Sequence, residues 1–206
     1  MFSSLSFHST LEVSGKRTER KILMEKQKFV ESILQGARES YRNYGILPSV
    51  TIAQAILESA WGESGLTKAA NNLFGIKWTD GCGFNYINYL TNEVIGGKTV
   101  KVNAKFRAYN SLDDSIVDHG RFLAKYKRYE SVLSSTTYYE QCSQLQKCGY
   151  ATDPSYAQKL INIIEQNGLA KYDKQEDENI VTYVFSPGTT SVIEVNGEKV
   201  RIMVLS

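Results

Sequence analysis

The sequence predicts a mainly α fold of the α+β class: a helical domain with a small β-hairpin lobe, followed by a short C-terminal β appendage. Three observations predict this fold. In several segments apolar residues recur every three or four positions, the period of an amphipathic helix. From Phe84 the period changes to two on either side of Gly96-Gly97, a strong hairpin turn. After Leu169 the composition shifts to a charged stretch, which short strand-like segments follow.

The length and composition bound the number of domains. The chain has 206 residues, of which 42% are hydrophobic, and this suits one globular domain with a short appendage. We expect an N-terminal arm over residues 1–23, which is a candidate for disorder because it is polar and charged. The main domain is expected over residues 24–172, and a charged linker with a short β appendage over residues 173–206.

Two helices are predicted before the hairpin. The first spans residues 21–44, where apolar and aromatic residues recur at helical spacing, and Gly45 ends it. A Leu-Pro connector leads to the second helix, which begins at Ser49 and stops near Gly62.

The hairpin and three more helices follow. Strands are predicted over residues 86–95 and 98–109. A capping box from Ser111 to Asp114 begins the third helix. The last predicted elements are a helix over residues 138–148, a helix from an Asp153 cap with Pro154 at its first position to Gly168, and strands over residues 180–185, 191–195 and 199–205.

The second helix carries one carboxylate near its end. On a helical wheel its apolar residues gather on one side, and Thr51, Gln54 and Glu58 share the opposite stripe, so we expect Glu58 to face away from the core. The unpaired carbonyls and the dipole of the helix end disfavour a negative charge, which should raise the pKa of this carboxyl group. A carboxyl that keeps its proton near neutral pH can protonate a departing oxygen.

A second carboxylate lies near the hairpin tip. If Gly96-Gly97 is a two-residue loop, Glu93 pairs with Val100 and has apolar and aromatic neighbours on its face of the hairpin. On sequence alone Glu93 is either a solvated residue at a strand end or a residue of a functional cleft.

Several function classes are disfavoured. A net charge of +2 is too small to indicate nucleic-acid binding, and no apolar run approaches the length of a membrane span. Three cysteines cannot form a full disulfide framework, and none has a metal-ligand partner at the usual spacing, so we expect free thiols, no metal and no cofactor. Thirteen tyrosines offer rings with a polar handle, which suits contact with sugars.

Five sequence blocks occur together and in order. They are Glu58-Ser-Ala-Trp61-Gly62-Glu-Ser-Gly-Leu66, Asn71-Asn72-Leu-Phe74-Gly-Ile-Lys77, Phe106-Arg-Ala-Tyr109, Ser115-Ile-Val-Asp118-His119 and Gly149-Tyr150-Ala-Thr-Asp153-Pro-Ser-Tyr156-Ala157. In these blocks the chain resembles the bacterial and phage endo-β-N-acetylglucosaminidases that cleave peptidoglycan, a group that includes autolysins, flagellar-rod muralytic domains and phage lysins. The resemblance spans residues 24–172 and excludes both ends of the chain.

The resemblance implies a lysozyme-like fold, a substrate and a set of site residues. The substrate would be the glycan strand of peptidoglycan, cleaved at the β-1,4 bond from N-acetylglucosamine to N-acetylmuramic acid. Glu58 would donate the proton, Glu93 would act as a base or stabilise positive charge, and Tyr150 would hold the acetamido group. The inverting, retaining and substrate-assisted mechanisms stay open. The implied substrate-binding residues are Trp61, Asn72, Phe74 and Tyr156, of which Trp61 and Phe74 are equally explained as packing residues.

Two alternatives stay open. One is a muramidase or lytic transglycosylase, since those enzymes also place a Glu followed by Ser on a helix of a lysozyme-like fold. The other is a non-catalytic wall-binding or assembly module. His119 is expected to be a hydrogen-bonded structural residue.

The site of action would be the bacterial cell wall. No signal peptide is visible at the N-terminus, so the expected routes are release by lysis, specialised export, or a leader missing from this sequence. The sequence does not indicate an oligomeric state.

Overall fold

The computed structural model describes residues 5–95, 98–174, 190–195 and 198–203. For residues 5–16, 19, 92–95 and those after 174 it describes the backbone alone. The chain divides into two compact units, residues 1–174 and residues 175–206.

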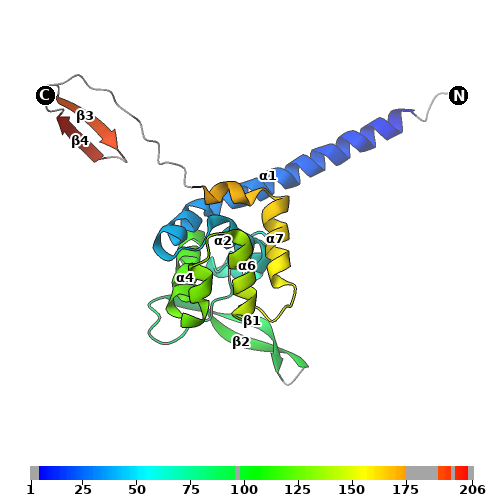
Figure 1. The fold of residues 1–206 in the computed structure, drawn as a ribbon. Coiled ribbons are helices and arrows are strands. Elements are labelled where there is room, and N and C mark those ends of the chain that lie inside the picture. The colour runs from blue at the N-terminus through cyan, green and yellow to red at the C-terminus, as the bar shows by residue number, and fades with distance from the viewer. Residues whose placement is uncertain (1–4, 96–97, 175–189, 196–197, 204–206) are drawn as a thin grey trace. The chain divides into compact units, whose positions relative to one another are not determined.

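The first unit is mainly helical, as predicted, with one two-stranded antiparallel sheet (Figure 1). Its α-helices are α1 (Leu5–Tyr44), α2 (Pro48–Ser59), α3 (Gly65–Ala70), α4 (Leu112–Lys125), α5 (Glu130–Leu133), α6 (Tyr138–Lys147) and α7 (Tyr156–Gln166). Two 3₁₀ turns, η1 (Lys127–Tyr129) and η2 (Leu169–Asp173), and the strands β1 (Asn85–Ile95) and β2 (Lys98–Ala108) complete it. None of the described helices is both long and apolar enough to cross a membrane.

The helix α2 lies at the centre of the helical core. It packs against α1, α6, α7 and η2, so nearly every side of it is covered. The prediction that its polar stripe faces away from the core is therefore wrong for Thr51 and Gln54, both of which are fully buried. A hydrogen bond makes this burial tolerable for Gln54, whose Nε2 donates to the hydroxyl of Tyr156 on α7 (3.0 Å).

Several helix ends differ from the prediction. The helix α1 begins at Leu5 instead of Lys21, so a segment of mixed polar and apolar residues extends it beyond the predicted start. The helix α7 begins at Tyr156, and Asp153 does not cap it; its Oδ1 accepts a hydrogen bond from the backbone of Ser155 in the preceding turn. The helix α3 was not predicted, because six residues are too few to show a period.

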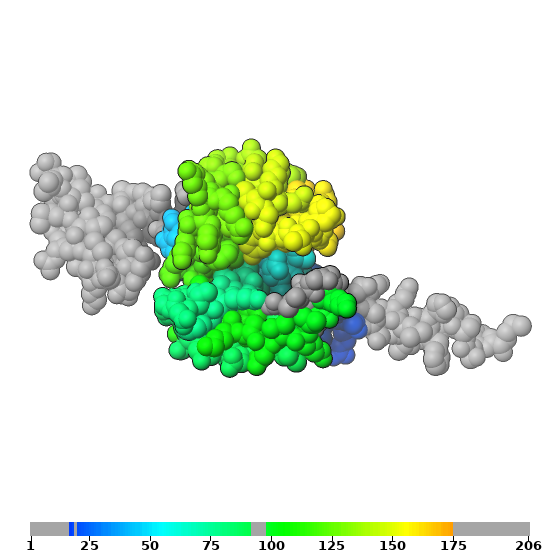
Figure 2. Space-filling model, turned by 90° about the horizontal axis from the view of Figure 1, so that it is seen from below, coloured from blue at the N-terminus to red at the C-terminus, as the bar shows by residue number. Residues whose placement is uncertain are grey.

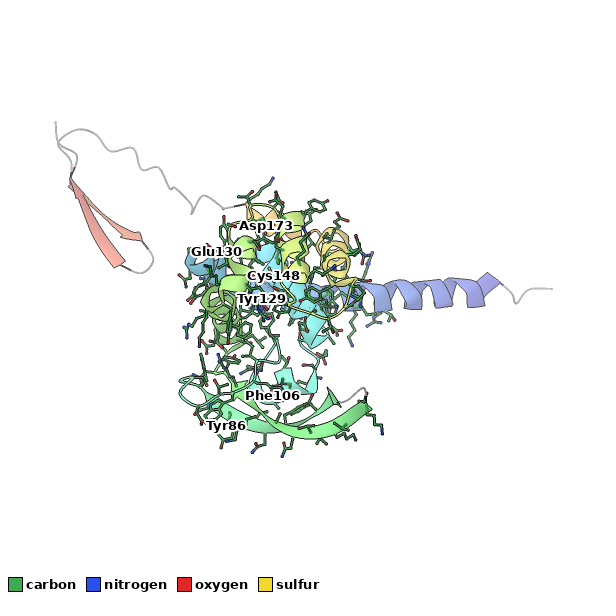
Figure 3. All side chains as sticks on the ribbon, turned by 60° about the horizontal axis from the view of Figure 1, so that its bottom comes forward. Tyr86, Phe106, Tyr129, Glu130, Cys148 and Asp173 are labelled. Carbon is green, nitrogen blue, oxygen red and sulfur yellow. The ribbon has the colours of Figure 1, made fainter. Side chains whose placement is uncertain are left out.

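The hairpin has the predicted register. Glu93 pairs with Val100 across the turn. The two faces differ in burial: Phe106 is 5% exposed, whereas Tyr86 is 42% exposed, and Figure 3 shows Phe106 on the side of the helical body and Tyr86 on the opposite side. Gly65 of α3 lies against the side chain of Tyr89, since a Cβ added at Gly65 would clash with the Tyr89 hydroxyl. The face of the hairpin that carries Tyr89 and Phe106 is therefore turned toward the helices, and we call it the inner face.

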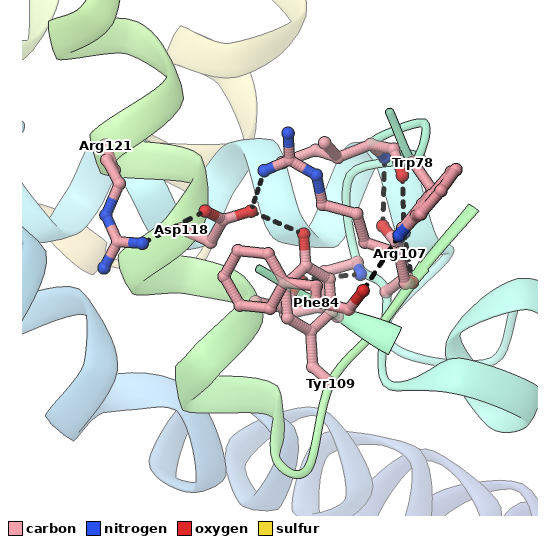
Figure 4. A network of polar contacts seen from close by, with 10 residues as sticks. Trp78, Phe84, Arg107, Tyr109, Asp118 and Arg121 are labelled. Atoms are coloured by element: carbon pink, nitrogen blue, oxygen red, sulfur yellow. Dashed lines mark hydrogen bonds and ion pairs between the residues drawn. The ribbon is translucent and has the colours of Figure 1, made fainter. Parts of the chain in front are cut away.

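A buried ion pair ties the end of β2 to α4 (Figure 4). Arg107 Nη1 lies 2.6 Å from Asp118 Oδ2, and the Tyr109 hydroxyl donates to the same oxygen at 2.8 Å. On its other side, Asp118 Oδ1 lies 3.8 Å from Arg121 Nη1. The side chain of Asp118 is 3% exposed, so its charge depends on these partners for stabilisation.

The second unit contains an antiparallel hairpin of β3 (Thr190–Val195) and β4 (Glu198–Met203). These strands agree with the predicted pair around Asn196-Gly197. The predicted strand over residues 180–185 lies outside the described residues.

Candidate active site

The helix α2 ends in an unusual left-handed turn. Ala60, Trp61 and Gly62 have φ angles of 51°, 62° and 79°, and a side-chain-bearing residue in this region costs about 1–3 kcal/mol. The hydroxyl of Ser59 holds the turn, since it donates to a carbonyl inside α2 at 2.5 Å and accepts from the Gly62 N–H at 2.7 Å. Glycine is required at position 62, because a Cβ there would stand 2.7 Å from the ring of Phe29. The last turn of α2 is thereby fixed.

Glu58 lies in this last turn, one residue before the end of α2. The residue as a whole is exposed, but protein atoms surround much of its carboxyl group. The carboxyl Oε1 accepts a hydrogen bond from the Tyr156 hydroxyl at 3.0 Å. This partial burial raises the pKa of Glu58, and the hydrogen bond from Tyr156 opposes the rise. The direction agrees with the sequence prediction, and loss of solvation around the carboxyl is a cause that the sequence did not reveal.

Two tyrosines stand beside Glu58. Tyr156, in the first turn of α7, is 3% exposed, and its hydroxyl links Gln54 to the Glu58 carboxyl. Tyr150 precedes α7 in the connecting loop, and its ring stacks on that of Tyr156 with centroids 5.5 Å apart and planes 28° apart. Burial and then the charge of Glu58 raise the pKa of Tyr150 well above its usual value, so its hydroxyl keeps its proton. The structure thus brings Glu58, Tyr150 and Tyr156 together.

Behind Tyr150 lies a buried histidine. His119 of α4 is 1% exposed, and its Nε2 lies 3.0 Å from the Tyr150 hydroxyl. Its ring stacks on Phe74 with centroids 3.9 Å apart. Burial lowers the pKa of His119 to about 3, so the ring is neutral near neutral pH. The expectation of a hydrogen-bonded residue holds, and its partner is a predicted site residue.

Two other predicted residues make structural contacts. Trp61 packs edge-on against Phe29 of α1, and Lys26 Nζ lies 4.8 Å from its ring centroid. Asn72 is 1% exposed, and its Nδ2 donates to the backbone carbonyls of Ile76 and Arg107 while its Oδ1 accepts from the Ile76 N–H. Asn72 therefore joins the segment after α3 to strand β2.

For Glu93 the backbone alone is described. It lies in β1, two positions along the strand from Thr91 and four from Tyr89, so the three residues share one face of the hairpin. Because Tyr89 meets α3, this face is the one turned toward the helical body.

The molecular surface is hollowed next to this face. Figure 2 shows a hollow between the green hairpin and the lime-to-yellow part that carries α6 and α7, with cyan to teal residues from the α2–α3 part of the chain along it.

A separate cavity of 340 Å³ lies where α1, α4 and the base of the hairpin meet. Three of the four acidic groups that line it are engaged within the fold: Asp113 accepts from the Gly36 N–H, Asp114 completes the cap of α4, and Asp118 forms the ion pair with Arg107. Neither Glu58 nor either of its tyrosine neighbours lines it. In the part of the chain that the structure describes, no three His, Cys, Asp or Glu residues gather so that they could hold a metal ion.

Sequence reasoning missed the two polar residues behind the tyrosines. Gln54 was placed on an exposed stripe, and His119 was not linked to Tyr150. A signal was present for Gln54, which stands four residues before Glu58 and so shares its face of the helix.

Comparison with known proteins agrees with this fold. Exo-glucosaminidase LytG of Bacillus subtilis (strain 168) is 41% identical over 169 residues, which cover 80% of this chain and 58% of LytG. The crystal structure of the catalytic domain of the autolysin Auto from Listeria monocytogenes superposes with a TM-score of 0.63 at 32% identity, over 84% of this chain and 99% of that domain. The glycoside hydrolase domain of FlgJ from Salmonella typhimurium, in C-terminally truncated form, gives a TM-score of 0.60 at 32% identity, over 70% of this chain and 98% of that domain.

The chain therefore spans somewhat more than half the length of LytG, while it contains nearly the whole of each compared domain. The predicted lysozyme-like, mainly α fold is confirmed. A protein-family model described as mannosyl-glycoprotein endo-beta-N-acetylglucosaminidase matches residues 34–169. With two thirds of its length matched by this model, the chain belongs to the glucosaminidase family of glycoside hydrolases.

Proposed function

We propose that this domain hydrolyses the β-1,4 bond between N-acetylglucosamine and N-acetylmuramic acid in the glycan strands of peptidoglycan. Family membership supports the substrate class and the kind of reaction. The observation that carries the proposal is the Glu58 carboxyl, which has a raised pKa, an exposed surface and a fixed position at the end of α2.

Glu58 acts as the general acid in this proposal. Its Oε1 already accepts the Tyr156 hydrogen bond, so the transferable proton sits on Oε2. From there it passes to the glycosidic oxygen as the bond to the leaving sugar breaks. The left-handed turn after Ser59 holds the helix end in place, which keeps the carboxyl in one position for this transfer.

Glu93 and Tyr150 act on the sugar whose bond is broken. Glu93, on the inner face of the hairpin, serves as a base for water or stabilises positive charge on the ring. Tyr150 holds the acetamido group for substrate-assisted attack. A carboxylate separation of roughly 5–5.5 Å would suit a direct nucleophile, whereas roughly 6.5–9.5 Å would leave room for a water molecule.

The predicted substrate-binding residues divide into two groups. Tyr156 acts mainly on Glu58, through the hydrogen bond that it donates. The other three residues, Trp61, Asn72 and Phe74, each make contacts within the protein, so in this proposal they support the shape of the hollow. The glycan strand then lies in the hollow between the hairpin and the α6–α7 part (Figure 2).

The test is digestion of purified peptidoglycan followed by mass spectrometry of the products, with Glu58→Gln as the inactive control. Products with N-acetylglucosamine at the reducing end are expected. Reducing-end N-acetylmuramic acid would show a muramidase, an anhydro sugar would show a lytic transglycosylase, and binding without products would show a wall-binding module. The length of the early products separates cleavage inside the strand from release of end units.

A further inference from the structure

Two stacked tyrosines of this site are each contacted from behind by a buried polar residue of another helix. For Tyr156 the hydrogen-bond directions are settled. Gln54 Nε2 donates to its oxygen at 3.0 Å, so its single hydroxyl proton is free to be donated onward to Glu58 Oε1, also at 3.0 Å. Because Gln54 is a donor to the Tyr156 oxygen, the Tyr156 hydroxyl proton is directed to Glu58.

The Tyr150 hydroxyl has the same arrangement with His119. Its oxygen lies 3.0 Å from Nε2, and the other ring nitrogen, Nδ1, is buried and has no hydrogen-bond partner among the described residues. A neutral imidazole carries one proton, on either Nε2 or Nδ1. The position of this proton decides whether His119 donates to Tyr150 or accepts from it.

The cost of an unpaired group separates the two forms. A proton on Nδ1 would leave a buried N–H donor without an acceptor. Such donors are rare in folded proteins, because each one costs the full free energy of removing the group from water. A proton on Nε2 leaves only an unfilled lone pair on Nδ1, which is the milder penalty. The charged form is disfavoured, since the ring is 1% exposed and stacks on Phe74, with no described carboxylate in hydrogen-bond contact with it.

We propose that His119 is a positioning residue: it donates from Nε2 to the Tyr150 oxygen and thereby commits the Tyr150 hydroxyl proton to an acceptor oxygen on the bound glycan. Phe74 supports this role, because its stacking fixes the plane of the imidazole. The proposal rests on the proposed function, in which the acceptor is the carbonyl oxygen of the acetamido group. Tyr150 then becomes a fixed donor that orients this oxygen and does not compete for the Glu58 proton.

A tautomer measurement tests the arrangement without any assay of activity. Long-range ¹⁵N–¹H NMR correlations report which imidazole nitrogen bears the proton, and the chain has only two histidines, so His119→Gln assigns the signals. The Nε2–H pattern is expected and should persist from pH 7.5 to pH 5. An Nδ1–H pattern, or a protonated ring at pH 5, would overturn the proposal whether or not the domain cleaves peptidoglycan.

Kinetics on soluble glycan fragments test the consequence. His119→Phe keeps a flat ring against Phe74 but has no donor, and it should lower kcat roughly 3–10-fold, with little change in KM, as expected for one hydrogen bond. Tyr150→Phe should lose at least as much, because it removes the donor to the glycan itself, and the double variant should lose little more than Tyr150→Phe, because His119 acts through that hydroxyl. His119→Gln can donate from its own Nε2 and should retain more activity than His119→Phe.

Two kinetic results would count against the proposal. One is a folded His119→Phe variant with parental kcat while Tyr150→Phe is impaired. The other is an equal loss in His119→Phe and His119→Gln, with additive effects of His119→Phe and Tyr150→Phe. If the parent itself cleaves no peptidoglycan, the proposed function fails, and the NMR measurement still decides the tautomer.

Discussion

The Tyr156 hydroxyl donates a 3.0 Å hydrogen bond to Oε1 of Glu58 from a position 98 residues further along the chain. This contact joins the end of α2 to the first turn of α7. It also opposes the effect of burial on Glu58, because a donor stabilises the ionised carboxylate while loss of solvation disfavours it. The acidity of Glu58 is thus set by two helices that meet only in the folded protein.

Glu58→Gln should keep the fold and nearly abolish lysis. The amide preserves the shape of the side chain but has no acidic proton, and loss of a general acid typically costs roughly 10²–10⁴-fold in rate. Clearing of purified cell walls measures the activity, and thermal unfolding checks the fold. A folded variant within a few-fold of the parent would show that Glu58 is not the acid.

Tyr156→Phe should move the basic limb of the pH–rate profile to higher pH. The lost hydrogen bond stabilises the ionised form of Glu58, so its removal raises the pKa further, and the protonated acid persists at higher pH. The profile of kcat/KM on soluble fragments measures this shift. Tyr139→Phe is the matched control, since the Tyr139 hydroxyl donates to Glu165 at the surface (2.7 Å). A shift to lower pH, or an equal shift in the control, would contradict the assignment.

Glu93→Gln should impair turnover more than wall binding. The residue lies in β1, paired with Val100, and in the proposed function it acts at the reacting sugar and not along the whole glycan contact. Rate on soluble fragments and binding to insoluble walls are measured in parallel. Equal losses of both would assign Glu93 to a substrate contact instead.

Asp118→Ala should destabilise the domain by about 3–5 kcal/mol, because it leaves the largely buried Arg107 charge without its partner. Chemical denaturation measures the free energy of unfolding. Glu63→Gln removes an ion pair of similar length to Lys68, but both side chains there are more than half exposed, so its cost should stay below about 1 kcal/mol. Comparable losses in the two variants would show that the Arg107–Asp118 pair does not anchor the hairpin.

Local rules predicted the parts of the fold that depend on neighbouring residues. The Gly96-Gly97 pair fixed the register that places Glu93 opposite Val100, and the Ser111 capping box gave the start of α4. Two of the five sequence blocks that carry the family resemblance are also in contact in the structure, since Arg107 and Tyr109 from one block bind Asp118 from another.

Tertiary contacts decided what the sequence pattern could not. The polar stripe of α2 looked solvent-exposed on a helical wheel, but α7 covers Gln54 and turns it into a donor for Tyr156. The pKa of Glu58 was predicted to rise because of the helix end, and packing around the carboxyl adds a cause that only the folded structure shows. The pairing of His119 with Tyr150 joins residues 31 apart, and no periodicity within one helix reports it.

A chain that ends at Lys174 should retain cleavage of soluble glycan fragments. The residues assigned to chemistry lie between Glu58 and Tyr156, and the boundary between the two compact units follows Lys174. Because η2 packs on α2 and Asp173 accepts two hydrogen bonds from Ser49, the truncation must keep residues 169–174. Activity on fragments, attachment to intact walls and thermal unfolding are measured together, and weaker attachment with parental cleavage would assign the tail to tethering. A folded truncation that no longer cleaves short fragments would show that residues 175–206 help to build the site, and the domain boundary proposed here would then be wrong.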